Sequence, residues 1–75
     1  MLDKIKESFN EVLSVPITKV TNETTIDNLS EWDSMKHMEL IMSLESKFGV
    51  SFEVNEIIEL NSVKKIVEII SSKLK

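Results

Sequence analysis

Apolar residues recur every three or four positions in three stretches of the chain, which is the spacing of amphipathic helices. The stretches contain Leu2, Ile5, Phe9, Val12 and Leu13, then the segment from Ser34 to about Phe48, then Val63, Ile66, Val67, Ile70 and Leu74. The first helix must end near Ser14, because the residue before Pro16 is pushed away from the helical region. The pattern therefore predicts three main helices.

The connections between these helices differ in length. Residues 15–33 form a long segment rich in Thr, Asn and Asp, which we expect to contain a short helical turn. Its expected apolar anchors are Ile17, Val20, Ile26 and Leu29. Loops this long are uncommon in compact domains and are often functional. Residues 55–60 are compatible with one or two helical turns, and Asn61 or Ser62 is expected to cap the last helix. The predicted fold is all-α: a small bundle of three main helices plus one short helix, with a long loop between the first and second helices, in a single domain over residues 1–75.

The second helix has recognisable start and stop signals. Asp33 is a good N-cap, because its carboxylate can accept a hydrogen bond from a free backbone N–H of the first turn. Gly49 can adopt the left-handed conformation that ends a helix, and Val50 can make the apolar contact of a Schellman cap. These signals place Ser34 at the first position of the helix.

Two apolar faces run along this second helix. With each residue advancing by about 100°, the side chains that fall together on a core-facing side are Leu40, Ile41, Leu44 and Phe48. Met35, Met38 and Met42 fall roughly opposite, with Glu39 and Glu45 on either side of them. Methionine is flexible and polarizable, and it is over-used at surfaces that fit several partners. We interpret the methionine stripe as a partner surface rather than as packing under the long loop or as scattered exposed apolar residues.

Composition excludes several classes of function. The net charge is −4 and all nine basic residues are lysines, so the chain has no basic stripe for nucleic acid. It has no cysteine and one histidine, which argues against a metal site. No apolar run approaches the roughly 20 residues that span a bilayer, and the first ten residues do not form a secretory signal. We expect a cytoplasmic protein that neither enters a membrane nor binds nucleic acid.

Ser34 is the strongest candidate for a functional residue, and it allows three interpretations. It can act as a helix cap, as a nucleophile with His37 as its base, or as the attachment point of a phosphoryl group, which a helix N-terminus favours. The chain has no Gly-rich oxyanion turn and little length for a pocket, which argues against a hydrolase. His37 is expected to be partly buried and bonded to the loop backbone, and Trp32 to pack where the loop meets the helix.

Residues 29–35, LSEWDSM, resemble the phosphopantetheine attachment motif of acyl carrier proteins, in which Asp-Ser-Leu opens the second helix. Met35 replaces the usual Leu. The resemblance continues through residues 39–45 (ELIMSLE), 47–50 (KFGV) and 60–63 (LNSV), and it covers nearly the whole chain. The motif alone is weakly specific, but it is joined here to the length, acidity and helix order of the family.

The resemblance implies a mechanism and a set of partners. A phosphopantetheinyl transferase would move 4'-phosphopantetheine from coenzyme A onto Ser34, beside Asp33, and the arm's thiol would carry an acyl group as a thioester. The protein would be no enzyme itself; it would work as a monomer and deliver the acyl group to loading and transferring enzymes with basic docking patches. By similarity the docking face comprises Met35, Met38, Glu39, Met42, Glu45, Glu56 and Ile57. The core beside Leu44, Ile57 and Leu60 would be where an acyl chain could enter.

The chain differs from carriers of general fatty-acid synthesis, and these differences indicate which kind of pathway it serves. Those carriers are more acidic along the second helix, where this chain has Lys36, Ser46 and Lys47. Trp32 and His37 are more similar to carriers of specialised biosynthetic pathways. An aminoacyl or peptidyl carrier uses the same serine chemistry and is therefore an alternative function. A non-enzymatic helical adaptor that binds partners through the methionine face is the remaining alternative.

Overall fold

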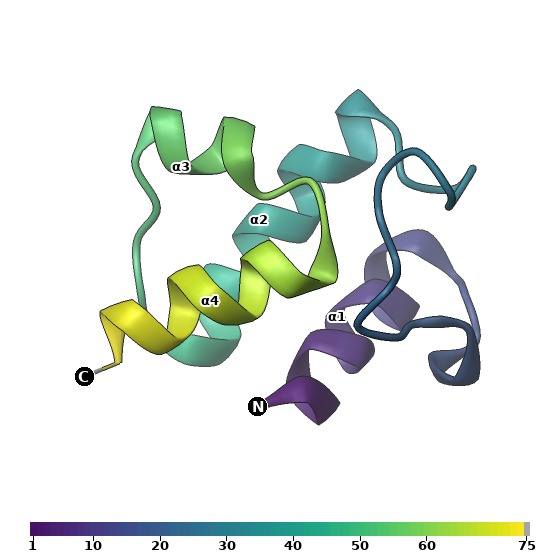
Figure 1. The fold of residues 1–75 in the computed structure, drawn as a ribbon, viewed down its shortest axis with the longest axis horizontal. Helices are drawn as coiled ribbons and strands as arrows, with labels where there is room; N and C mark the ends of the chain where they lie inside the picture. The colour runs from purple at the N-terminus through teal and green to yellow at the C-terminus, as the bar shows by residue number, and fades with distance from the viewer. Residues whose placement is uncertain (75) are drawn as a thin grey trace.

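Four α-helices follow one another along residues 1–74, the part of the chain that the structure, a computed structural model, describes (Figure 1). They are α1 (Leu2–Leu13), α2 (Ser34–Phe48), α3 (Val54–Glu59) and α4 (Val63–Lys73), and one 3₁₀ turn, η1 (Ile17–Lys19), lies in the long loop. None of these helices is long and apolar enough to cross a membrane. The predicted all-α bundle with one short helix is confirmed, and α3 begins one residue earlier than expected.

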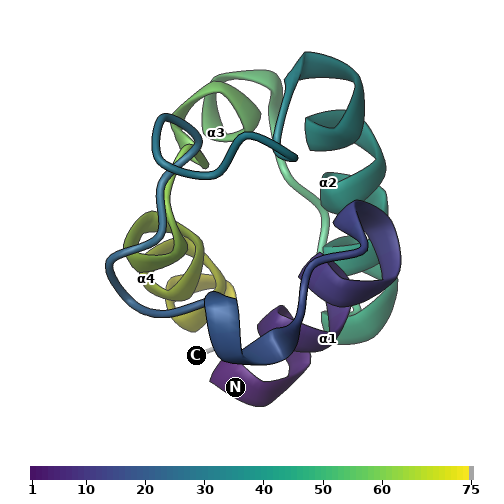
Figure 2. The ribbon, with the colours of Figure 1, turned by 90° about the vertical axis from the view of Figure 1, so that its right-hand side faces the viewer.

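The helices surround one apolar interior (Figure 2). Its buried residues are Ile5, Phe9, Leu13, Val15, Val20, Leu29, Trp32, Leu40, Ile41, Leu44, Phe52, Leu60, Val63, Ile66 and Ile70. Full burial of one such large side chain stabilises the fold by about 1.5–3 kcal/mol, so this cluster is the main source of stability. The predicted core face of α2 is confirmed, with Phe48 only half-buried at its end.

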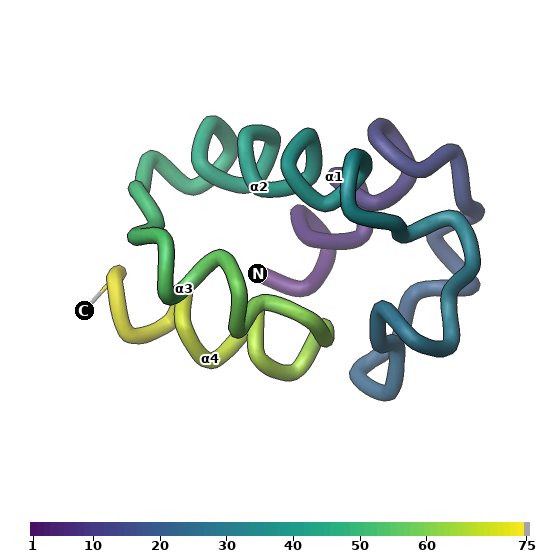
Figure 3. The backbone as a smooth tube through the Cα atoms, turned by 90° about the horizontal axis from the view of Figure 1, so that it is seen from above, coloured from purple at the N-terminus to yellow at the C-terminus, as the bar shows by residue number. Residues whose placement is uncertain are grey.

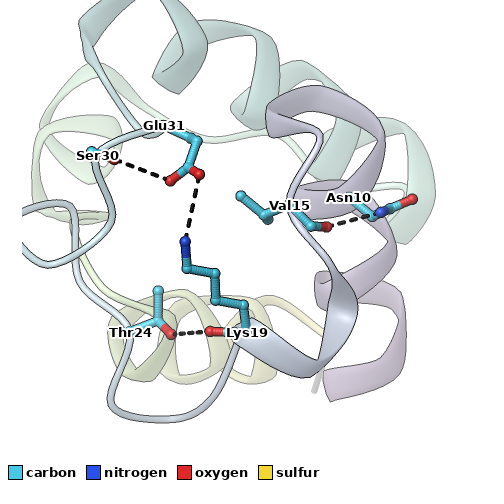
Figure 4. Close-up of polar contacts among 6 residues, drawn as sticks. All are labelled: Asn10, Val15, Lys19, Thr24, Ser30 and Glu31. Atoms are coloured by element: carbon cyan, nitrogen blue, oxygen red, sulfur yellow. Dashed lines mark hydrogen bonds and ion pairs between the residues drawn. The ribbon is translucent and has the colours of Figure 1, made fainter.

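Helix α1 ends at its C-cap, Ser14, whose backbone is in the left-handed conformation. Ser14 has φ 58°, and its N–H donates to the carbonyl of Asn10 at 3.0 Å. The Asn10 side chain then donates to the carbonyl of Val15 at 2.8 Å (Figure 4). Val15 turns inward and is fully buried, whereas Ile17 is 51% exposed. The prediction of Ile17 as an anchor was therefore wrong, because a single surface 3₁₀ turn buries none of its residues.

The long loop is tied down along its length. Backbone N–H groups of Ile26 and Val63 donate to the carbonyls of Asn61 and Thr24, both at 2.9 Å, which joins the loop to the start of α4. Nearer α2, the Lys19 ammonium lies 3.5 Å from the Glu31 carboxylate (Figure 4). These contacts hold the segment that leads into α2 in a fixed place.

The long loop lies at the end of the molecule where α2 begins (Figure 3). The opposite end of α2 is closed by Gly49, which has φ 66°, a conformation that glycine adopts without the steric cost of a Cβ. The N–H groups of Gly49 and Val50 both donate to the carbonyl of Glu45, at 2.9 and 3.3 Å. The predicted left-handed glycine ending is therefore present, and the Val50 N–H makes the 6→1 hydrogen bond of a Schellman motif. At α4, Ser62 is the cap, and it accepts from the N–H of Lys65 at 3.1 Å.

Candidate functional site

Ser34 is the first residue of α2, and its side chain is exposed. The preceding residue, Asp33, is extended and caps the helix: its carboxylate accepts from the N–H of Lys36 at 2.9 Å, and its carbonyl accepts from the N–H of His37 at 2.8 Å. Because Asp33 does the capping, the Ser34 hydroxyl is left to face solvent. The positive end of the helix dipole favours an anionic group such as a phosphate at this position.

Trp32 and His37 form a hydrogen-bonded chain beside Ser34. The indole Nε1–H of Trp32 donates to Nδ1 of His37 at 2.9 Å, and Nε2 of His37 lies 2.8 Å from the carbonyl oxygen of Ile57 in α3. An indole N–H can only donate and a carbonyl can only accept, so the two contacts fit the tautomer in which Nδ1 of His37 accepts and Nε2 donates. Trp32 is buried at the junction of loop and helix, as predicted.

These contacts decide the role of His37. Both of its ring nitrogens are bonded to other groups, so it does not serve as a base for Ser34, and a Ser–His dyad is not formed. It is half-buried as expected, but its partners are an indole and a carbonyl of α3 rather than the loop backbone. The sequence did not reveal this link, because Ile57 is twenty residues away along the chain.

The methionine stripe of α2 is exposed. Met35, Met38 and Met42 have exposed fractions of 79%, 50% and 66%. The interpretation that they do not pack under the long loop is therefore confirmed. On α3, Val54 and Ile58 are also strongly exposed, at 77% and 72%. Sequence reasoning missed this pair, although their spacing of four residues would have placed both on one face of a helix.

The other predicted docking residues have more varied surroundings. Glu39 is exposed and lies 3.8 Å from the ammonium of Lys36. The carboxylate of Glu45 accepts from the backbone N–H of Phe52 at 2.9 Å, which ties α2 to the segment before α3. Ile57 is half-buried and packs against the core. Glu39 thus faces solvent, whereas Glu45 and Ile57 make contacts that also stabilise the fold.

Glu56 links α3 to α4. Its carboxylate accepts from the backbone N–H of Glu53 at 2.8 Å and pairs with the Lys73 ammonium at 2.8 Å. The Glu53 N–H and then Lys73 hold the pKa of Glu56 below its ordinary value of 4.5, because both stabilise the charged form. Glu56 therefore stabilises the helix junction as a carboxylate.

Replacement of Glu56 by Gln is expected to lower stability near neutral pH. A depressed folded-state pKa contributes stability above the unfolded value of 4.5, and that contribution disappears as the pH falls through the folded value. The stability gap between wild type and Glu56→Gln should therefore close in acid, as measured by urea unfolding across pH 3 to 7. Glu59→Gln, on the exposed side of the same helix, is the matched control. A gap that stays constant through this range would contradict the assignment.

The family model described as "Phosphopantetheine attachment site" matches residues 3–70. The chain belongs to this family. Among relatives, the acyl carrier protein of Thermotoga maritima is 35% identical over 75 residues, covering 99% of this chain and 91% of the relative. That of Petrotoga mobilis is 32% identical over 74 residues, covering 99% and 87%. Both relatives are acyl carrier proteins, which is the family that the sequence resembles.

The solved structure of a holo acyl carrier protein from Geobacter metallireducens superimposes on this chain with a TM-score of 0.85. Its sequence is 32% identical, and the match covers 97% of this chain and 84% of that one. The acyl carrier protein fold is thus shown for this chain, and its cofactor is covalently bound 4'-phosphopantetheine. An exposed serine hydroxyl at a capped helix N-terminus fits the phosphodiester of this group.

Proposed function

We propose that the chain carries acyl groups as thioesters on a 4'-phosphopantetheine arm attached to Ser34. The observation that supports this most is the position of Ser34. It is the exposed first residue of α2, and it is not needed as the helix cap because Asp33 is the cap. A solvent-facing hydroxyl can enter the active site of a transferase while the helix remains intact. The domain that does this extends over residues 1–75.

The chemistry of loading needs little from the chain itself. A phosphopantetheinyl transferase joins the Ser34 oxygen to the phosphorus nearest the pantetheine of coenzyme A, and the remaining nucleotide leaves as the other product. The serine proton goes to a base of the transferase, since His37 is bonded to Trp32 and Ile57. The chain has no cysteine, so the reactive sulfur arrives with the arm. The protein then presents the thioester and catalyses nothing.

The wild-type chain offers a direct test. Incubation with coenzyme A and a broad-specificity phosphopantetheinyl transferase should add the mass of one arm, measured by intact mass spectrometry. One free thiol per chain should appear at the same time in a thiol assay, on a protein that has no cysteine. Omission of the transferase is the control. If neither the mass nor the thiol appears while a known carrier is loaded in parallel, the proposed function fails.

The surface beside Ser34 is proposed to dock partner enzymes. Its centre is formed by Met35, Met38, Glu39 and Met42, which are all exposed, and by similarity it also includes Glu45, Glu56 and Ile57; Val54 and Ile58 of α3 are exposed apolar side chains as well. Exposed large apolar side chains that gather near a functional group mark interaction sites. The net charge of −4 favours partners with basic patches around this surface.

Replacement of Met42 by Lys is expected to slow arm transfer to Ser34. Loss of an apolar anchor and addition of a positive charge should lower kcat/KM of the transferase at least about tenfold, which corresponds to about 1.4 kcal/mol. Ser72→Lys is the matched control, since it adds the same charge on an exposed position of α4. Equal slowing by both variants would show a general charge effect and count against a docking role for Met42.

The pathway is proposed to be a specialised biosynthesis rather than general fatty-acid synthesis. The support is the mixed charge of α2, where Lys36 pairs with Glu39 and Lys47 lies 3.3 Å from Glu11 and 3.6 Å from Glu7 of α1. An aminoacyl or peptidyl cargo uses the same arm. Loading assays with acyl and aminoacyl ligases encoded beside the gene would distinguish an acyl cargo from an aminoacyl or peptidyl cargo.

The exposed methionine stripe also supports a second candidate, a helical adaptor that needs no arm. An adaptor predicts a partner whose affinity is weakened by Met38→Lys and unchanged by Ser34→Ala. A carrier predicts that the delivery of cargo depends on both residues. Titration calorimetry with a partner enzyme, using the forms with and without the arm, separates these outcomes.

A further inference from the structure

The seam between α2 and α3 is bridged one helical turn from Ser34. The end of α3 meets the beginning of α2 there (Figure 1), and the imidazole of His37 donates across the seam to the carbonyl of Ile57 at 2.8 Å. The same imidazole accepts from Trp32 at 2.9 Å on its other side. Two residues that flank Ser34 are therefore joined to each other and to α3.

The interior next to this bridge is filled. Trp32 is 2% exposed and packs edge-on against Phe9, with ring centroids 5.0 Å apart. Leu44 and Leu60, from α2 and from the end of α3, have no exposed surface. A chain that entered between α2 and α3 would have to separate His37 from Ile57. That separation would leave the buried indole of Trp32 and the half-buried imidazole of His37 without their hydrogen-bond partners, which proteins avoid.

We infer that the hydrogen-bonded chain Trp32–His37–Ile57 closes the seam between α2 and α3, so that a group carried on the arm stays outside the helices. His37 is the specificity-determining residue. The cargo class that fits is a short or polar acyl group, because such a group gains little from burial, whereas a long apolar chain would be left in water. The inference rests on the proposed function of Ser34.

The test compares two cargoes on the same protein. Ser34 is loaded from butyryl-coenzyme A or octanoyl-coenzyme A with a broad-specificity transferase, and the thioester is then cleaved with hydroxylamine, which forms a hydroxamate and frees the thiol. A buried thioester is shielded from such attack. We expect the two cleavage rates to agree within about threefold, because neither chain enters the helices. A larger slowing of the octanoyl form would overturn the inference.

Variants at His37 test the bridge itself. His37→Gln keeps a donor and an acceptor and should retain the wild-type ratio of rates. His37→Val removes both and should slow octanoyl cleavage more than about threefold relative to butyryl, because the seam can then open. A helical His37→Val protein with the wild-type ratio would overturn the assignment to His37.

A second measurement serves if His37→Val does not fold. The indole N–H resonance of the single tryptophan, Trp32, should be the same in the butyryl and octanoyl forms of the wild-type protein. A shift of this resonance with chain length would overturn the inference. Failure of the arm to attach, seen by intact mass, contradicts the proposed function instead, so the two failures are distinguishable.

Discussion

Replacement of Ser34 by alanine is expected to abolish attachment of the phosphopantetheine arm. The hydroxyl oxygen of Ser34 becomes part of the phosphodiester, so its removal leaves no nucleophile at the start of α2. The fold should be unaffected, because Asp33 supplies the cap and Ser34 is exposed. A surface change of this kind alters stability by less than about 0.5 kcal/mol. Intact mass after incubation with coenzyme A and transferase measures the loss.

Two other serines control for the specificity of this result. Ser30 lies shortly before α2, with its hydroxyl bonded to Glu31, and Ser46 is exposed further along α2. Ser30→Ala and Ser46→Ala should both accept one arm, as the wild type does. If Ser34→Ala gains the same mass as the wild type, the attachment site is elsewhere and the assignment of Ser34 is wrong.

Replacement of Phe9 by alanine is expected to remove most of the stability of the domain. Phe9 is fully buried in α1 and packs edge-on against Trp32, which belongs to the segment that leads into α2. Truncation of a buried phenylalanine costs about 3–5 kcal/mol through lost burial and the cavity that remains. A single core in a chain this short rarely supplies more than about 3–5 kcal/mol in total. The variant should therefore be largely unfolded at room temperature.

Urea unfolding followed by far-ultraviolet circular dichroism measures this effect. Met35→Ala is the matched control, because it truncates a large apolar side chain that is 79% exposed, and it should change stability by less than about 0.5 kcal/mol. A Phe9→Ala protein that loses less than about 1 kcal/mol would show that the interior around Trp32 can collapse around the missing ring.

Local patterns along the chain were sufficient to predict the helices. The spacing of apolar residues predicted α1, α2 and α4, and short-range signals predicted helix termini at Asp33, at Gly49 and at Asn61 or Ser62, of which Ser62 is the cap. These features depend on interactions between residues only a few positions apart, so they can be read without knowledge of the fold. The same spacing predicted the exposed methionine stripe, because a helix cannot bury two opposite faces in a small bundle.

Contacts between distant residues could be decided only by the tertiary structure. Ile17 is exposed and Val15 is buried, because the path of the long loop around α1 selects which apolar side chain turns inward. Glu45 and Glu56, which belong to the predicted docking face, have backbone and Lys73 partners that periodicity does not reveal.

Ser34 shows both kinds of information in one place. The sequence by itself determined that a serine follows a helix cap, since that depends on Asp33 and the first turn of α2 alone. The tertiary structure decided what surrounds it, because α3 has to fold back before the carbonyl of Ile57 can meet His37. That meeting leaves the Ser34 hydroxyl without a histidine base and closes the seam beside it.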